Sequence, residues 1–253
     1  MPPESFEPTF AILLYIALVY VLSGVVKGVL GIGLPLVSIP LLAGTVGPIT
    51  AMSLLAVPTV VINLWQTAQS GYMGGALKRF WAAYPLLIGG VIVGVAFLTS
   101  LDGKAVFVLV GAVVILIALA QLLPFNLTIP HRSERWATPA IGIVSGLLGG
   151  ISSFLGPLMA MYLMALRVTK DQFVGAIALF YLIASIPFFL GLAANGLFGW
   201  TELWASCGAT VMIWLGVLLG QRLRALASGE LFRRLVLGLL VVVGANMVRK
   251  GLM

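Results

Sequence analysis

A glycine-rich run, GVVKGVLGIG at residues 24–33, interrupts a long apolar segment near the N-terminus. Apart from this run, the segment from about residue 10 to residue 44 is almost entirely apolar. Closely spaced glycines weaken helices, because glycine loses the most backbone entropy on folding and readily adopts left-handed conformations. We therefore expect a broken helical hairpin at 10–44, with its break at residues 28–33.

A second run of the same kind, GIVSGLLGGI at residues 142–151, lies in the other half of the chain. An offset of 118 residues aligns its first three glycines with those at 24, 28 and 31, and a proline follows each run, Pro40 and Pro157. The segment 137–165 would form two arms around the sequence GGISS, at 137–149 and 154–165. Neither arm exceeds about 20 Å at 1.5 Å per residue. We expect a re-entrant hairpin, which a membrane tolerates where protein or a water-filled cavity covers the backbone.

The remaining apolar runs are long enough to cross a membrane. The chain has 253 residues, of which 61% are hydrophobic and 8% are charged, and its mean hydropathy is +1.17. This composition excludes a water-exposed surface, and a helix needs roughly 20 apolar residues to cross a bilayer. We therefore predict an all-α polytopic membrane protein, with transmembrane helices at 48–69, 80–99, 104–123, 171–193, 200–221 and 232–249.

These segments divide the chain into two similar halves. Residues 1–123 hold one hairpin and three crossings, residues 124–136 form a cytoplasmic linker, and residues 137–253 repeat the order. Because three is odd, the second repeat enters the membrane from the opposite side, so the repeats are predicted to be inverted. With the N-terminus outside, ten of the 14 basic residues fall inside and three outside, with Lys27 within the first hairpin. This is the bias that the positive-inside rule expects.

Inverted repeats with discontinuous helices are typical of secondary transporters, which bind substrate near the bilayer midplane where the broken helices meet. Glycines four residues apart also serve simple helix packing, which is the usual role of an isolated motif of this kind. Two matched copies with a consistent charge bias favour a binding site.

Several functions are excluded by what the sequence lacks. The net charge is +7, but the basic residues flank apolar runs and form no stripe with aromatic residues, so nucleic-acid binding is not expected. A single cysteine, Cys207, and a single histidine, His131, provide no set of metal ligands, and we expect neither a metal nor a cofactor. An intramembrane enzyme would need a nucleophile, a base or a metal, and these are missing.

The first run and its surroundings resemble a known family. The LGIG core at residues 30–33 and the PLL at 40–42 are similar to the signature of the TauE/SafE sulfite-exporter family of membrane permeases, and residues 142–157 sit where its second signature is expected. Family members commonly have a further glycine after the core, where this chain has Leu34-Pro35. The resemblance covers essentially the whole chain. It implies a bacterial inner-membrane carrier for sulfite, sulfonates or related small organic anions.

Lys27 is the most informative side chain of the predicted site. A charged residue at the centre of a membrane helix costs about 2.5–3.5 kcal/mol on insertion scales, and such residues usually serve function. The seven acidic residues all map to loops or span ends, so an anionic substrate would complete the pair. In the alternative interpretation the arm 10–27 crosses fully and Lys27 reaches an interface. At the offset of 118 its counterpart is Ser145, which predicts an asymmetric site.

The other predicted substrate-binding residues are polar groups or backbone groups near the two breaks. Helices that begin near Leu34 and Phe154 would direct N–H groups and positive dipole ends at an oxyanion. Ser152 and Ser153 occupy N-cap positions, where they could donate to the substrate or cap their own helix. Asn63, Gln66 and Gln69 could line an inner vestibule or bond between helices. The remaining predicted residues are Gly28, Gly31, Gly33, Gly146, Gly149, Gly150, Ser53, Thr59, Tyr181 and Ser185.

The sequence therefore predicts a multi-pass secondary transporter of the bacterial inner membrane. It would move a small anion, sulfite or an organosulfonate, by alternating access between the two hairpin breaks. An anion channel, or a carrier of small carboxylates, is the alternative. The expected partners are the anionic substrate and the lipid bilayer, and the sequence leaves a homo-oligomeric state open.

Overall fold

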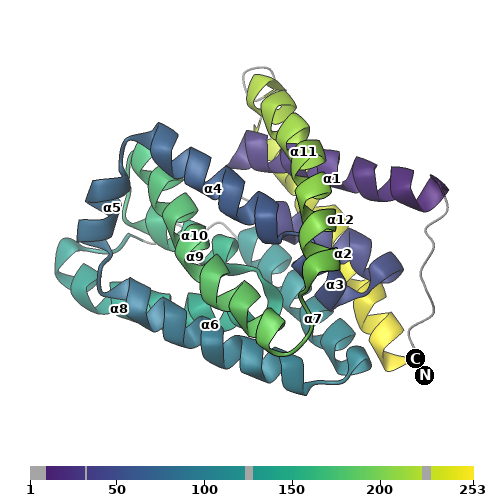
Figure 1. Cartoon of the computed structure of the whole chain (residues 1–253). Coiled ribbons are helices and arrows are strands. Elements are labelled where there is room, and N and C mark those ends of the chain that lie inside the picture. Colours follow the sequence, from purple (N-terminus) through teal and green to yellow (C-terminus); the bar gives the residue numbers. More distant parts are fainter. Residues whose placement is uncertain (1–9, 32, 123–127, 224–228) are drawn as a thin grey trace.

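The structure is a computed structural model that describes residues 10–31, 33–122, 128–223 and 229–253 (Figure 1). Within these residues the backbone forms helices and turns, with no strand. The helices are α1 (Phe10–Leu30), α2 (Leu34–Val46), α3 (Pro48–Ser53), α4 (Ala56–Ser70), α5 (Met73–Arg79), α6 (Ala83–Ser100), α7 (Gly103–Leu122), α8 (His131–Ser152), α9 (Leu155–Ala165), α10 (Lys170–Ala194), α11 (Trp200–Leu223) and α12 (Gly229–Leu252).

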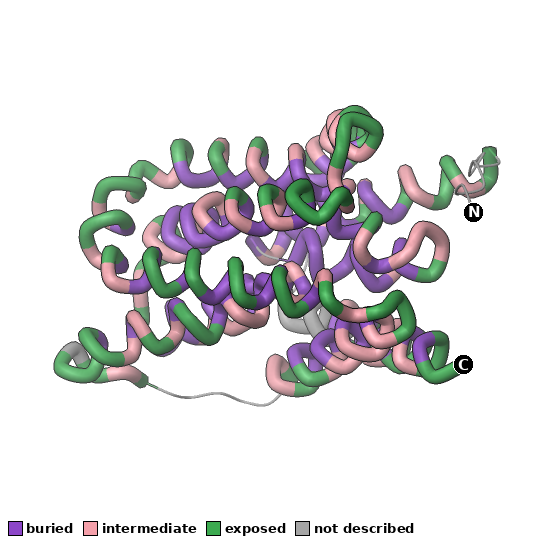
Figure 2. Tube along the Cα trace, turned by 60° about the horizontal axis from the view of Figure 1, so that its bottom comes forward, coloured by how far each residue is buried: buried purple, intermediate pink, exposed green. Residues whose placement is uncertain are grey.

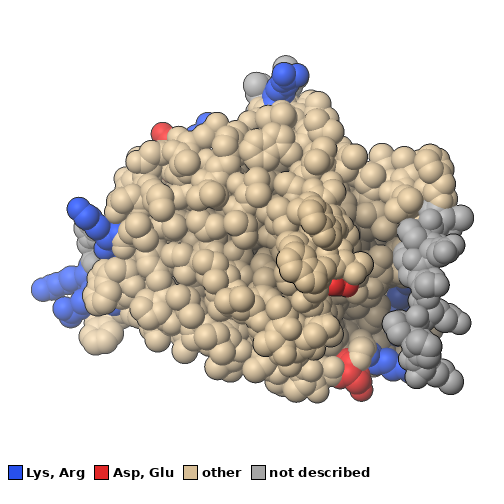
Figure 3. Space-filling model, viewed as in Figure 1, with Lys and Arg blue, Asp and Glu red and all other residues tan. Residues whose placement is uncertain are grey.

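The described helices have the lengths and surfaces of a membrane protein. Six stretches are long and apolar enough to cross a bilayer: α1, the stretch Pro48–Ser70, α6, α7, α10 and α11. Buried residues lie along the middle of the bundle, whereas many large apolar side chains on its outer faces are exposed (Figure 2). Most charged side chains visible in Figure 3 lie at the margins, and the broad middle of that face is largely uncharged. The chain is therefore an all-α polytopic membrane protein.

The crossing predicted at 48–69 is two helices rather than one. α3 ends at Ser53 and α4 begins at Ala56. Pro58 explains the interruption, because it lacks the N–H that would bond the Leu54 carbonyl in a continuous helix. Ser206 of α11 replaces that bond: its hydroxyl donates to the Leu54 carbonyl and accepts from the Val57 N–H, both at 2.9 Å. The other predicted crossings match α6, α7, α10, α11 and α12 to within a few residues, and residue 123 lies outside the described residues.

A pair of helices occupies the position of each predicted hairpin, α1 with α2 and α8 with α9, and the first helix of each pair is longer than expected. α1 has 21 residues and continues to Leu30, and α8 has 22 residues and runs from His131 to Ser152. The boundary of the linker was wrong, because residues 131–136 belong to α8, while residues 124–127 lie outside the described residues. The prediction of a break at 149–153 was also wrong in extent, since the interruption is confined to Ser153 and Phe154. At 1.5 Å per residue α8 is about 33 Å long, but its first turns are charged, and it is not among the stretches apolar enough to cross a bilayer.

The arms of each hairpin fold back on each other. In the first hairpin the Tyr15 hydroxyl of α1 donates to the Leu41 carbonyl of α2 at 2.8 Å. In the second, the Ile129 N–H just before α8 donates to the Ala165 carbonyl at the end of α9, at 3.0 Å. The second hairpin therefore ends beside the point where it began.

The two breaks share two features at an offset of 122 residues, one helical turn more than the offset of 118 that aligns the glycines. Gly31 and Ser153 both have left-handed backbones, with φ of 79° and 63°. Pro35 near the start of α2 corresponds to Pro157 near the start of α9. At this offset Lys27 aligns with Gly149, whereas at the predicted offset it aligns with Ser145. The offset of 118 aligns three glycines, whereas the offset of 122 aligns two, Gly24 with Gly146 and Gly28 with Gly150, so glycine spacing alone favours the first register.

Close helix pairs connect the two halves of the chain. α1 packs along α11, α6 along α8, α4 along α10 and α7 along α12. Glycines face glycines in the first two pairs: a Cβ built on Gly24 would lie 2.9 Å from the Gly216 Cα, and one on Gly146 would lie 3.1 Å from the Gly90 Cα. Many of the glycines that suggested a break therefore permit close packing of continuous helices.

Candidate functional site

Lys27 lies inside the bundle and points at α4 and α10. Its side chain is 2% exposed, and its Nζ donates a 2.8 Å hydrogen bond to Asn63 Oδ1 of α4. The same Nζ lies 5.2 Å from the centre of the Tyr181 ring of α10. Although α1 is long enough to span, Lys27 does not extend to an interface, so the alternative of an interfacial lysine was wrong.

Asn63 holds its oxygen toward Lys27 because its own amide is anchored. The Asn63 Nδ2 donates to the Thr59 carbonyl one turn earlier on α4, at 2.7 Å, which leaves Oδ1 as the acceptor for Nζ. Sequence reasoning considered Asn63 only as a vestibule residue or an interhelical partner, and the structure supports the second role. The position of Asn63 one turn after Thr59 was the sequence signal that placed it near the site. Its partner Lys27 could not be identified without knowing how α1 and α4 are arranged.

The charge of Lys27 has no carboxylate partner among the described residues. Among the described residues, the carboxylate in a salt bridge is that of Glu134, whose Oε1 lies 2.6 Å from Arg79 Nε and joins α8 to α5. The hydrogen bond with Glu134 raises the pKa of the Arg79 guanidinium. Burying an ammonium ion costs several kcal/mol. The hydrogen bond to Asn63 and the contact with the Tyr181 ring each stabilise the buried ammonium by about 1–3 kcal/mol. A monovalent anion about 4 Å from Nζ would add roughly 4 kcal/mol at an effective dielectric constant of about 20.

Tyr181 connects the two hairpins. One side of its ring faces Lys27 of the first hairpin, and its hydroxyl bonds to the backbone of Gly156 in the first turn of α9. A Cβ on Gly156 would collide with this hydroxyl, so glycine is required for the contact. The side chain of Tyr181 thus touches groups beside both breaks, which are far apart in the sequence.

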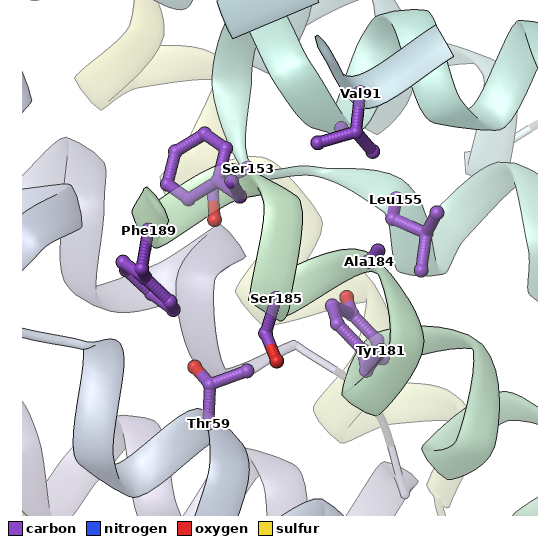
Figure 4. A pocket seen from close by; sticks show the side chains of 10 residues that line it. Thr59, Val91, Ser153, Leu155, Tyr181, Ala184, Ser185 and Phe189 are labelled. Carbon is purple, nitrogen blue, oxygen red and sulfur yellow. The ribbon is translucent and has the colours of Figure 1, made fainter. Parts of the chain in front are cut away.

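A small cavity lies next to Tyr181, between α4, α6, α10 and the second break (Figure 4). Its volume is about 20 Å³, which is room for a single water molecule. Figure 4 shows the side chains of Thr59 from α4 and Ser185 from α10 beside each other. A sulfite or sulfonate group is too large for this space. The lining residues are Thr59, Val91, Gly149, Ser153, Leu155, Tyr181, Ala184, Ser185, Phe188 and Phe189.

The cavity therefore brings together five of the residues predicted from the sequence: Thr59, Gly149, Ser153, Tyr181 and Ser185. The apolar wall of Val91, Leu155, Ala184, Phe188 and Phe189 was not predicted. Apolar residues in a membrane helix look the same in sequence whether they face lipid, core or a site, so no signal distinguished them.

The other predicted polar residues have different surroundings. Ser53 donates to the Leu197 carbonyl at 2.9 Å. Ser152 donates to the Leu148 carbonyl of its own helix and accepts from the Phe154 N–H. The expected N-cap role was wrong, because the N-cap of α9 is Phe154 and Ser153 is the left-handed C-cap of α8. Ser145 is fully buried, and its hydroxyl has no hydrogen-bond partner among the described residues.

The predicted glycines also separate into groups. Gly28, Gly146 and Gly150 lie against the backbones of neighbouring helices, where a Cβ would collide. Gly31 and Gly33 have positive φ values of 79° and 108° and form the first break. Among the described residues, no three His, Cys, Asp or Glu side chains come together as metal ligands.

The fold defines a multi-pass membrane protein, and Lys27 is buried in its interior. Residues 16–247 match the model of the family described as Sulfite exporter TauE/SafE, and this range is nearly the whole chain. The chain belongs to this family, which makes it a membrane transport protein for sulfur-containing anions. No curated protein and no solved structure matches it.

Proposed function

We propose that the protein is a secondary transporter that carries sulfite or an organosulfonate across the bacterial inner membrane by alternating access. The anion binds beside Lys27 and Tyr181, with hydroxyls of Thr59, Ser153 and Ser185 available to its oxygens. The observation that carries this proposal is the buried Lys27, whose hydrogen-bond acceptor is a neutral amide.

Chemistry favours a sulfur oxyanion at this position. A sulfite or sulfonate group has three oxygens and a delocalised negative charge, so it can accept from the Lys27 ammonium and from hydroxyls on several helices at once. Small carboxylates have two oxygens and are the second candidate, because the same cation would attract them. The family membership supports the sulfur anions.

The helix pairing supports two related halves that move against each other. Suppose that α1 corresponds to α8 and that α6 corresponds to α11. Exchanging the two halves then converts the pair α1–α11 into the pair α8–α6, and both pairs are present. The pairs α4–α10 and α7–α12 are unchanged by the exchange. This is the pattern that a two-fold axis between inverted repeats produces. The cavity lies between elements of both halves, as alternating access requires.

The test is sulfite exchange in proteoliposomes. A carrier should show saturable counterflow. Vesicles loaded with unlabelled sulfite should accumulate labelled sulfite transiently, because each unlabelled ion that leaves lets the binding site return with a labelled ion. Conductance in planar bilayers, with no counterflow, would support the channel instead. Inhibition of exchange by acetate at concentrations at which methanesulfonate has no effect would support the carboxylate carrier.

A further inference from the structure

We propose that Lys27 also carries the coupling ion of the transport cycle: it takes up a proton when the anion binds and gives the proton up when the anion leaves. One proton and one monovalent anion would then cross together. This inference rests on the proposed function, and it adds the identity of the ion that moves with the anion.

The surroundings of Lys27 accept either protonation state of the amine. Asn63 Oδ1 accepts a hydrogen bond from Nζ, and a neutral amine retains two N–H donors, so this bond persists when the proton leaves. The Tyr181 ring favours the cation but is uncharged. A fixed carboxylate partner would instead hold the proton permanently, and none contacts Lys27 among the described residues.

No carboxylate contacts Lys27 from the helices that pack against α1, which are α2, α11 and α12, or from α4 and α10, which contact the Lys27 side chain, among the described side chains. α2 and α4 have no ionisable side chain. On α10 the ionisable side chains are Lys170 and Asp171 at its start and Tyr181, the one that faces Lys27. The remaining ionisable residues are Glu202, Cys207 and Arg222 on α11, Arg249 and Lys250 among the described side chains of α12, and Tyr15 and Tyr20 on α1 itself.

Binding of the anion and of the proton must then reinforce each other. Full burial disfavours an ammonium ion that has only neutral partners, whereas an anion beside Nζ favours it. Linkage requires the effect to be reciprocal, so the proton raises the affinity for the anion by the same factor. The amine takes its proton from water on the side where the anion enters and returns it to water on the other side. The loaded site carries no net charge.

Binding measurements test the linkage directly. Methanesulfonate is the first probe because it stays ionised throughout the neutral and alkaline range. Calorimetry in two buffers with different ionisation enthalpies counts the protons taken up per anion bound. We expect about one proton per anion at alkaline pH, and a dissociation constant that rises about tenfold per pH unit, the slope of one linked proton. Sulfite is the second probe. Because sulfite itself takes up protons, its contribution to the measured proton uptake is subtracted by comparison with the variants described next.

Two variants hold the charge constant. Lys27→Arg keeps the cation at every accessible pH, because guanidinium does not deprotonate in proteins. Asn63→Asp gives Lys27 a carboxylate partner of nearly the same shape, so the ammonium persists without the anion. In both variants we expect no proton uptake and no pH dependence of the dissociation constant, and Asn63→Asp should also bind the anion more weakly. If the bulkier arginine prevents folding, Asn63→Asp provides the comparison on its own.

Transport measurements complete the test. An inward methanesulfonate gradient across wild-type proteoliposomes should acidify the lumen, as read by a trapped pH dye, and an imposed membrane potential should not change the initial rate. Flux that follows the potential without acidification, or binding without proton uptake, would overturn the coupling and leave the transporter assignment in place. Absence of both sulfite and methanesulfonate transport at every pH would overturn both.

Discussion

Polar side chains inside this bundle have two kinds of role. Several hydroxyls donate a hydrogen bond only to a carbonyl of their own helix. Ser23 donates to the Val19 carbonyl and Ser38 to the Leu34 carbonyl, both at 2.7 Å. Asn63 and Ser206 instead reach other helices, where Asn63 accepts from Lys27 and Ser206 bonds both sides of the α3–α4 break. The second group fixes the positions of helices around the site.

Ser206→Ala should destabilise the protein because it leaves the Leu54 carbonyl and the Val57 N–H without their partner in an apolar interior. A buried polar group left without a partner costs about 1–3 kcal/mol. Thermal unfolding in detergent measures the loss, and Ser38→Ala is the matched control, since its hydroxyl bonds only to its own helix. Equal melting temperatures for the two variants would show that Ser206 does not support the break.

At the scale of the helix, the interruptions arise at left-handed residues and prolines rather than at every glycine. α1 ends at Leu30, before Gly31, and α8 ends at Ser152, before Ser153, and both following residues have positive φ. Other glycines remain helical, and in each of α1, α6, α8 and α11 some of them let the helix backbones approach closely.

Two adjacent glycines of α6 distinguish the effect of close helix packing from the effect of glycine on helix stability. Gly90→Ala should destabilise the protein strongly, because a Cβ there would lie 2.6 Å from the Ile143 carbonyl oxygen of α8. Gly89→Ala should be neutral or stabilising by up to about 1 kcal/mol, since its Cβ would meet nothing within 4 Å and alanine favours helix. Thermal unfolding of the purified variants measures both effects. Similar stabilities would contradict the packing assigned to the α6–α8 pair.

The sequence predicted the helical class, the number of hairpins and most span positions, because hydropathy and glycine spacing depend on local composition. It did not predict the α3–α4 break, because the effect of Pro58 depends on Ser206 of α11, far along the chain. It placed Thr59, Gly149, Ser153, Tyr181 and Ser185 in the site, and these do line one cavity. The partnership of Lys27 with Asn63 could not be predicted, because it requires knowing which faces of α1 and α4 meet.

For the whole molecule, the helix pairing places the candidate site between two halves with similar elements. The cavity is bounded by α4 and α6 of the first half and by α8, α9 and α10 of the second, and Tyr181 contacts Lys27 of the first hairpin beside it. In the proposed mechanism, relative movement of the halves opens this space to one side at a time.

Sulfite binding and exchange by Lys27→Met is the most direct test of a buried cation at the anion site. Methionine has nearly the volume and flexibility of lysine without its charge, so the variant should fold while binding and counterflow fall at least about a hundredfold, the loss expected from roughly 3–4 kcal/mol of attraction. Lys78→Met, the same change at an exposed helix end, should leave both unchanged. Wild-type sulfite affinity and exchange in a folded Lys27→Met protein would contradict the site described here.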